Sequence, residues 1–149
     1  DPAPMVEDED ADARAASFQK TRDARRTEIA EDYLEMIADL IDETGEARAA
    51  DLAKRFGVAQ ATVTKAVARL QREGWVETQP YRAIFLTDEG RAIAEKSKAR
   101  HRVVTAVLVE LGVPEEIADA DAEGMEHYIS EETLGAFERF LSACENKRN

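Results

Sequence analysis

The chain has 149 residues, 44% of them hydrophobic, which is enough for one domain or two small modules with an apolar core. Its 20 basic and 32 acidic residues give a formal net charge of −12, a balance that ordinarily argues against a nucleic-acid partner. No apolar run approaches the roughly 18 residues of a membrane span, and no basic-then-apolar leader opens the chain. We therefore expect a cytoplasmic protein with no membrane partner. The single cysteine, Cys144, cannot form an internal disulfide or, by itself, a thiolate metal site.

The charge is distributed unevenly along the chain. Residues 48–86 hold seven basic and three acidic residues, a net charge of +4, whereas the segments before and after carry −10 and −6. We call residues 48–86 the basic island. The total charge is thus an average over unlike parts, and it does not exclude DNA as a partner of the island.

The N-terminal part divides into a tail and a helix. Residues 1–17 are acidic and have almost no large apolar side chains, which predicts a disordered acidic tail. From about Phe18 to Glu43 apolar residues recur at three- and four-residue steps, which predicts a helix with one apolar stripe. The members of that stripe are Ile29, Tyr33, Met36, Ile37, Leu40 and Ile41.

The basic island contains shorter elements. Residues 49–56 and 60–72 are each followed closely by a glycine and predict two helices joined by a short turn. Residues 75–78 and 83–86 are rich in strand-forming residues and predict a small hairpin. Helix, turn, helix and hairpin is the order of a winged helix-turn-helix, in which the second helix enters the major groove of DNA.

Three helices are predicted in the C-terminal part. Thr87 is placed to cap a long helix that reaches about Leu111, and Pro114 suits the first turn of the next. Ser130 suits the cap of a last helix, which reaches about Cys144.

The predicted second helix of the island offers polar side chains on the side away from its apolar residues. Gln and Thr can reach base edges, whereas Lys and Arg contact phosphates, and the tip of the hairpin can touch the DNA backbone or minor groove. The candidate DNA-binding residues are Gln60, Thr62, Thr64, Lys65, Arg69, Arg72, Tyr81 and Arg82. The alternative is that these are ordinary solvated helix faces of an all-α domain. We favour DNA binding because the helix order, the hairpin and the only positive segment coincide.

The two histidines of the chain lie near carboxylates. Glu123, Glu126 and His127 are spaced so that one helix would place them on neighbouring turns, although acidic helices produce this spacing by chance. Asp32 and Glu35 share one flank of the first long helix, and His101 lies on the helix after the hairpin. Each of these residues alone is as well explained as an ordinary surface side chain. Convergence of the three helices would create an oxygen- and nitrogen-rich site without sulfur, which suits Mn²⁺ or Fe²⁺.

Taken together, these residues resemble a known family. The stretch from Glu31 to Glu35, the winged helix-turn-helix, His101 and the segment from Asp121 to His127 are similar to the manganese transport regulators, a branch of the diphtheria toxin repressor family. The resemblance covers about residues 25 to 140. One departure is Tyr128, which stands where some relatives have a second histidine.

The resemblance implies a metal site, a fold and an assembly. It implies a two-ion manganese site on Asp32, Glu35, His101, Glu123, Glu126 and His127, which could also bind Fe²⁺ or Zn²⁺. It implies a mainly α fold with a small β-hairpin wing, in which a winged helix-turn-helix domain (18–90) precedes a helical dimerisation and metal-binding domain (91–149). It also implies a homodimer that binds double-stranded DNA at palindromic operators when manganese is bound.

We therefore expect a manganese-responsive transcription regulator, mainly a repressor, that controls manganese homeostasis genes and is not an enzyme. The first alternative is a winged-helix regulator that does not respond to metal. The second is a small binuclear metallohydrolase, since two bridged ions can activate water. No glycine-rich phosphate loop or other sign of a small-molecule substrate site supports the second alternative.

Overall fold

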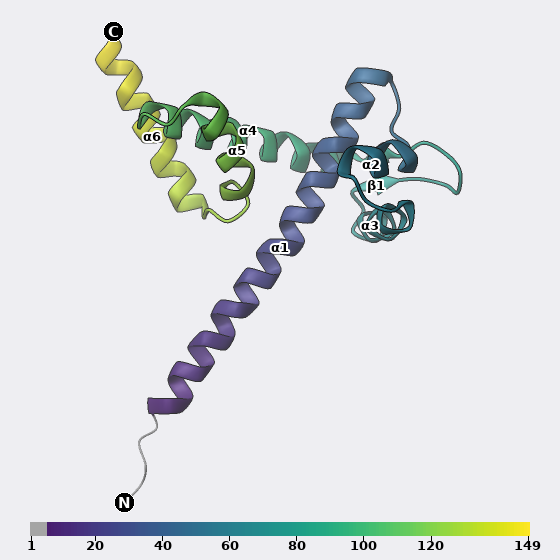
Figure 1. Cartoon of the computed structure of the whole chain (residues 1–149), viewed down its shortest axis with the longest axis horizontal. Coiled ribbons are helices and arrows are strands. Elements are labelled where there is room, and N and C mark those ends of the chain that lie inside the picture. The colour runs from purple at the N-terminus through teal and green to yellow at the C-terminus, as the bar shows by residue number, and fades with distance from the viewer. Residues whose placement is uncertain (1–5) are drawn as a thin grey trace, which may run out of the picture.

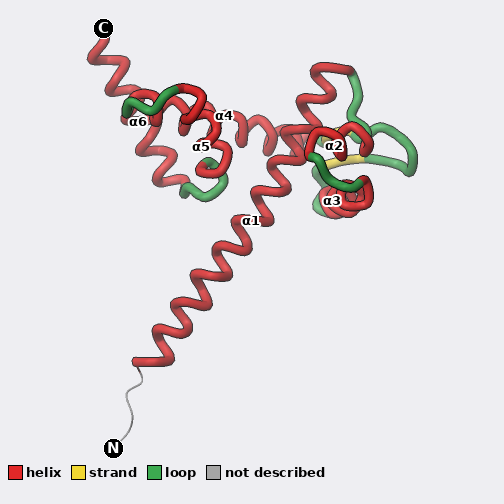
Figure 2. Tube along the Cα trace, in the orientation of Figure 1, coloured by secondary structure: helices red, strands yellow, loops and turns green. Residues whose placement is uncertain are grey.

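The computed structural model describes residues 6–149, and it contains six helices and one two-stranded antiparallel sheet in this range (Figure 1). The elements in chain order are α1 (Val6–Thr44), α2 (Ala49–Phe56), α3 (Gln60–Arg72), β1 (Val76–Glu77), β2 (Phe85–Leu86), α4 (Asp88–Glu110), α5 (Glu115–Met125) and α6 (Glu131–Arg148). Helices and loops make up nearly all of the trace, as Figure 2 shows.

The long helix α1 begins earlier than the sequence predicted. Residues 6–17 are helical and continue straight into the rest of α1, so the structure differs there from the expected disordered tail, while residues 1–5 lie outside the described range. This segment is rich in alanine, and adding turns to an existing helix avoids the cost of nucleation. The described side chains from Glu9 to Asp23 are all exposed, and this half of α1 projects away from the other helices (Figure 1).

The C-terminal half of α1 builds the core of the basic island. Tyr33, Leu34, Ile37 and Leu40 are buried, and they pack in one cluster with apolar side chains of α2, α3 and the sheet. Members from the island are Leu52, Val63, Val67, Leu70, Val76 and Ile84. The sheet is short, with Val76 opposite Leu86 and Glu77 opposite Phe85, so it forms the small wing that the sequence predicted.

The long helix α4 connects the two halves of the molecule. It leaves the wing at Thr87, packs against α1, and then packs against α5 and α6 (Figure 1). Thr87 and Ser130 cap α4 and α6 as predicted, because each side chain accepts a hydrogen bond from the backbone N–H three residues later. None of the described helices is long and apolar enough to cross a membrane.

Some details differ from the sequence prediction. Ile29 is 55% exposed and lies outside the core, because the packed part of α1 begins one turn later. The strands are two residues each, and α6 extends to Arg148.

The junction between the wing and α4 predicts a sensitive position. A Cβ atom on Gly90 would overlap the backbone carbonyl of Trp75, which cannot move as a flexible side chain would. We expect Gly90→Ala to lower the free energy of unfolding by about 3 kcal/mol in urea denaturation. Gly124→Ala in α5 is the matched control, because its Cβ would meet open space, and it should leave stability unchanged or slightly raised. Equal stability of the two variants would contradict the close contact.

Candidate metal centre and nucleic-acid interface

A row of four carboxylates runs along one face of α1. Glu28 and Glu31 precede Asp32 and Glu35, respectively, by four residues, so each pair stacks on successive turns of the helix. At 3.6 residues per turn this row lies roughly opposite the core residues of α1. The same helix therefore presents apolar side chains to the basic island and carboxylates to the C-terminal helices.

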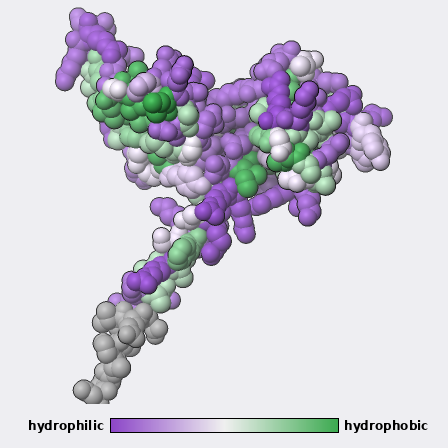
Figure 3. Space-filling view, in the orientation of Figure 1, coloured by the Kyte–Doolittle hydropathy of each residue, from purple (hydrophilic) through white to green (hydrophobic). Residues whose placement is uncertain are grey.

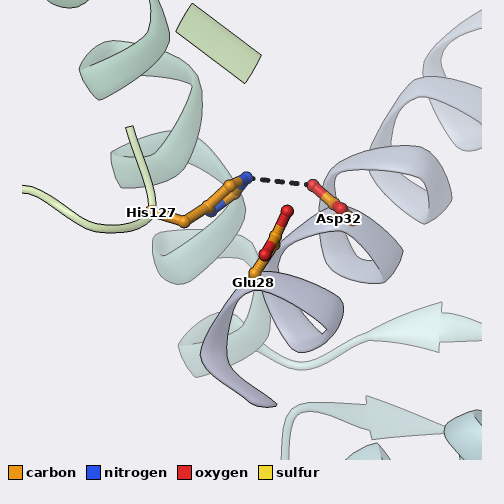
Figure 4. Close-up of side chains that lie close together, drawn as sticks. All are labelled: Glu28, Asp32 and His127. Atoms are coloured by element: carbon orange, nitrogen blue, oxygen red, sulfur yellow. Dashed lines mark ion pairs between the residues drawn. The ribbon is translucent and has the colours of Figure 1, made fainter. Parts of the chain in front are cut away.

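His127 meets this row from the turn that follows α5. Its imidazole is fully buried, with Nδ1 2.7 Å from Glu31 Oε2 and Nε2 3.1 Å from Asp32 Oδ1. Glu28, Asp32 and His127 each offer a ligand atom to one small volume, and Figure 4 shows the three side chains pointing toward one another. Tyr128 donates a hydrogen bond of 2.7 Å to Glu28 and so adds a second contact between the turn and α1.

His101 forms a second cluster from α4. Its Nδ1 lies 2.7 Å from Glu126 Oε2 and 3.7 Å from Glu123 Oε1, and these three residues also offer ligand atoms to one small volume. Its Nε2 lies 2.6 Å from Asp119 Oδ1. The sequence-predicted pair of Glu123 and Glu126 is brought together, although α5 ends at Met125 and leaves Glu126 in the cap position.

Glu126 joins the two clusters. It is fully buried, and its two oxygens face different histidines, because Oε2 contacts His101 while Oε1 lies 3.3 Å from His127 Nε2. Among the described residues, Glu126 Oε1 and His127 Nε2 are buried without a partner in hydrogen-bond geometry. Buried polar atoms without partners are costly, and a cation between a carboxylate oxygen and an imidazole nitrogen would satisfy both. The donor set therefore fits a divalent cation with a preference for oxygen and nitrogen ligands.

Glu35 lies beside the clusters and is in neither ligand group. The hydroxyl of Ser97, a buried residue of α4, donates hydrogen bonds to Glu35 and, at 3.4 Å, to Glu31. Ser97 thereby joins α4 to the carboxylate row of α1.

The crowded charges change how the site binds protons. Burial raises the pKa of Glu126 to about 7, although the two histidines lower it. Burial lowers the pKa of His127, but Asp32 and Glu31 outweigh burial and raise it to about 10. Burial also raises the pKa of Glu35. The metal-free site therefore holds protons at neutral pH, and a cation must displace them.

The structure brings together five of the six predicted ligands in two groups and places the sixth, Glu35, next to them. The ligand set itself stays a prediction. Sequence reasoning missed Glu28, Glu31 and Asp119 as members of the site. The spacing of Glu28 and Glu31 relative to Asp32 and Glu35 was a usable signal, whereas Asp119 had none beyond its position one turn before Glu123.

The predicted DNA-binding residues are all exposed, but they lie in different places on the surface. Gln60, Thr64, Tyr81 and Arg82 line one groove of about 610 Å³ between α3 and the wing. Tyr81 is fully exposed at the wing tip, with a φ of 63° that is unusual for a residue other than glycine.

The other members of the predicted set lie outside this groove. Lys65 and Arg69 line a separate pocket of about 580 Å³ between α3, α1 and α4, which also contains Arg26, Lys96 and Arg100. Thr62 and Arg72 line neither pocket.

A winged helix-turn-helix attached to a helical unit that carries a histidine and carboxylate centre defines the class of metal-dependent transcription regulators. Residues 26–84 match the family model described as the iron dependent repressor, N-terminal DNA binding domain. Residues 87–148 match the iron dependent repressor, metal binding and dimerisation domain. The chain belongs to this family, which confirms the resemblance found in the sequence.

Individual relatives give a narrower comparison. The transcriptional regulator MntR of Escherichia coli O6:H1 is 52% identical over 123 residues, which are 83% of this chain and 79% of the relative. The regulator MntR of Geobacillus kaustophilus is 39% identical over 67% of this chain and 71% of the relative.

A solved structure described as a manganese-dependent transcriptional repressor in complex with manganese matches with a TM-score of 0.68 and 30% identity. The match covers 76% of this chain, which spans about half the length of that structure. The family and its named relatives establish a metal-responsive DNA-binding regulator with the fold that the sequence predicted, and they do not favour an enzyme.

The raised pKa values predict an unusual pH dependence for the metal-free protein. A raised pKa means that the folded state keeps a proton that the unfolded chain has lost, so the stabilisation is complete below the unfolded pKa and is lost as pH rises through the folded one. For Glu126 this window runs from 4.5 to about 7, and for His127 from 6.5 to about 10. We expect the free energy of unfolding to fall from pH 5 to pH 9, by about 1.4 kcal/mol for each unit of pKa shift.

Urea denaturation in the presence of a chelator measures this dependence. Glu126→Gln should remove the fall between pH 4.5 and 7 and leave the fall at higher pH. Glu132→Gln, at an exposed carboxylate of α6, is the control and should follow the unmodified protein. A stability that rises steadily from pH 5 to pH 9 would show that the buried site does not hold these protons.

Proposed function

We propose that this protein is a manganese-responsive regulator, mainly a repressor, that acts in the cytoplasm on manganese homeostasis genes as a homodimer bound to palindromic operators. The single observation that carries the metal part is that the buried atoms Glu126 Oε1 and His127 Nε2 have no hydrogen-bond partner although they lie between two groups of ligand atoms. The solved structure of a manganese-dependent repressor in complex with manganese supports the choice of metal.

The proposed site holds up to two divalent ions. One ion would be held by His101, Glu123 and Glu126, and the other by Asp32 and His127 with either Glu28 or Glu35. A bound cation supplies positive charge that neutralises the carboxylates and directly links α1 to α4 and α5. Glu126 is the bridging candidate because each of its oxygens faces a different histidine.

The proposed response to metal depends on the two faces of α1. One face forms the core of the DNA-binding unit, and the other carries the carboxylate row. Fixing the carboxylates against α4 and α5 therefore fixes α2 and α3 relative to the C-terminal helices. In a dimer this sets the separation of the two α3 helices, which must match successive major grooves for both to bind.

The C-terminal helices are the proposed dimer interface, and we place the boundary between the two domains near residue 90. Exposed apolar side chains gather on these helices, as the space-filling view shows (Figure 3). The large ones are Val109, Leu111, Ile117, Met125 and Phe140. Apolar surface of this kind is typical of a contact between subunits.

The decisive experiment is DNA binding with and without manganese. Duplexes are first selected from a random library in the presence of Mn²⁺ and then titrated by fluorescence anisotropy in Mn²⁺ or chelator. We expect Mn²⁺ to raise affinity by a factor on the order of 5 to 150, and the selected sequence to contain an inverted repeat. His101→Ala and Glu123→Ala should remove most of this increase.

Asp121→Ala is the matched control, because Asp121 is an exposed carboxylate of α5 that lies in neither ligand group. It should retain the full response. Equal affinity of the unmodified protein in Mn²⁺ and in chelator would refute the metal response while leaving DNA binding intact. Selected sequences without an inverted repeat would contradict the palindromic operator.

Arg69 tests the contact between α3 and the DNA backbone. It is an exposed cation on α3, and removal of one phosphate contact weakens binding to all sequences and reduces the salt dependence. We expect Arg69→Ala to lower the slope of log affinity against log salt by about 1 without changing sequence preference. Lys147→Ala in α6 is the control for the loss of one positive charge, and an unchanged slope for Arg69→Ala would remove this residue from the interface.

A further inference from the structure

The two histidines of the site present different ring nitrogens to the proposed metal positions. His101 turns Nδ1 toward Glu126 and Glu123, whereas His127 turns Nε2 toward Asp32 and Glu126. The remaining nitrogen of each ring contacts a carboxylate outside its ligand group. Asp119 Oδ1 lies 2.6 Å from His101 Nε2, and Glu31 Oε2 lies 2.7 Å from His127 Nδ1.

This pairing has a direct chemical consequence. An imidazole binds a cation through a nitrogen lone pair, so its single remaining proton must be on the other nitrogen. A carboxylate that accepts this N–H keeps the proton there, holds the ring in one orientation and makes the ligating nitrogen more basic. We propose that Asp119 and Glu31 are positioning residues that assign Nδ1 of His101 and Nε2 of His127 to metal binding. This inference rests on the proposed metal site and adds the residues that orient it.

The surroundings of the two carboxylates support this role. Asp119 lies one turn before Glu123 on α5, so both reach His101, but they meet opposite nitrogens of its ring. Glu31 also lies 3.4 Å from the hydroxyl of Ser97. Neither Asp119 nor Glu31 belongs to a group of converging ligand atoms among the described residues. The two nitrogens of an imidazole point away from each other, so a carboxylate bound to one cannot share a cation bound to the other.

Measurements of Mn²⁺ affinity distinguish a positioning role of Asp119 and Glu31 from a purely electrostatic effect of their negative charge. Isothermal titration with Mn²⁺ compares Asp119→Ala with Asp119→Asn, and Glu31→Ala with Glu31→Gln. The alanine variants should bind Mn²⁺ about 10- to 100-fold more weakly. The amide variants should recover most of the loss, because an amide oxygen still accepts the imidazole N–H. Asp121→Asn and Asp42→Asn, at exposed carboxylates of α5 and α1, are the controls and should leave the affinity unchanged.

Nitrogen-15 NMR of the protein loaded with Cd²⁺, a diamagnetic probe, identifies the ligating nitrogens. We expect coordination by Nδ1 of His101 and Nε2 of His127 in the unmodified protein. In Asp119→Ala we expect His101 no longer to coordinate through one nitrogen alone, and in Glu31→Ala we expect the same for His127. The amide variants should restore coordination through a single nitrogen.

The outcomes distinguish the two proposals. Cd²⁺ bound to Nε2 of His101, or amide variants as weak as the alanine variants, would overturn the positioning role and leave the metal site standing. Alanine variants with unchanged affinity and unchanged coordination would do the same. Failure of the unmodified protein to bind either Mn²⁺ or Cd²⁺ would overturn the proposed function and, with it, this inference.

Discussion

The contact between His127 and the carboxylate row of α1 is the interaction on which the other features depend. His127 is buried and contacts Glu31 and Asp32 of α1, which are far from it in the sequence. The opposite face of α1 is the core of the DNA-binding unit. A change of charge at this contact therefore bears on the position of the helices that read DNA, although no side chain of the metal centre lies on α3.

Crowding several carboxylates around the buried Glu126 is unfavourable unless their charge is compensated. In the metal-free protein the compensation comes from protons, as the pKa values of about 7 for Glu126 and about 10 for His127 indicate. Protons and cations thus compete for the same atoms, and metal binding releases protons. The formal net charge of −12 counts both histidines as neutral and every carboxylate as ionised, so the protons held at the site make the metal-free chain less negative than this value.

The sequence predicted the order of the elements well because each is encoded locally. Periodic apolar residues, the glycines after α2 and α3, and the caps Thr87 and Ser130 act within a few residues of the structure they determine. The first turns of α1 were mispredicted because low hydrophobicity was given more weight than high helix propensity. The side chains of residues 9–17 are exposed, yet this segment continues a helix whose later turns pack in the core.

The metal centre was predictable only in part, because its partners come from distant segments. The helical register placed Asp32 and Glu35 on one flank, but it did not show that the imidazole of His127 would lie nearer to Glu31 and Asp32 than to Glu35. Nor did any local pattern mark Asp119 as the partner of His101, since that contact depends on the packing of α4 against α5. The residue types indicated a metal site with oxygen and nitrogen ligands, whereas the tertiary contacts determine which carboxylate lies against which imidazole nitrogen.

The geometry of the long helices explains how a small site can control the whole molecule. Between Val6 and Thr44, α1 contains neither glycine nor proline, so it has no obvious internal hinge. The helix α4 leads from the wing to the C-terminal helices, and Ser97 marks where it touches the carboxylate row of α1. If α1 and α4 were joined only at the Ser97 contact, the two helices could pivot about it. The contacts of His101 with Glu126 and of His127 with Glu31 and Asp32 tie both helices to the α5 region, so a change in the angle between α1 and α4 would break at least one of them.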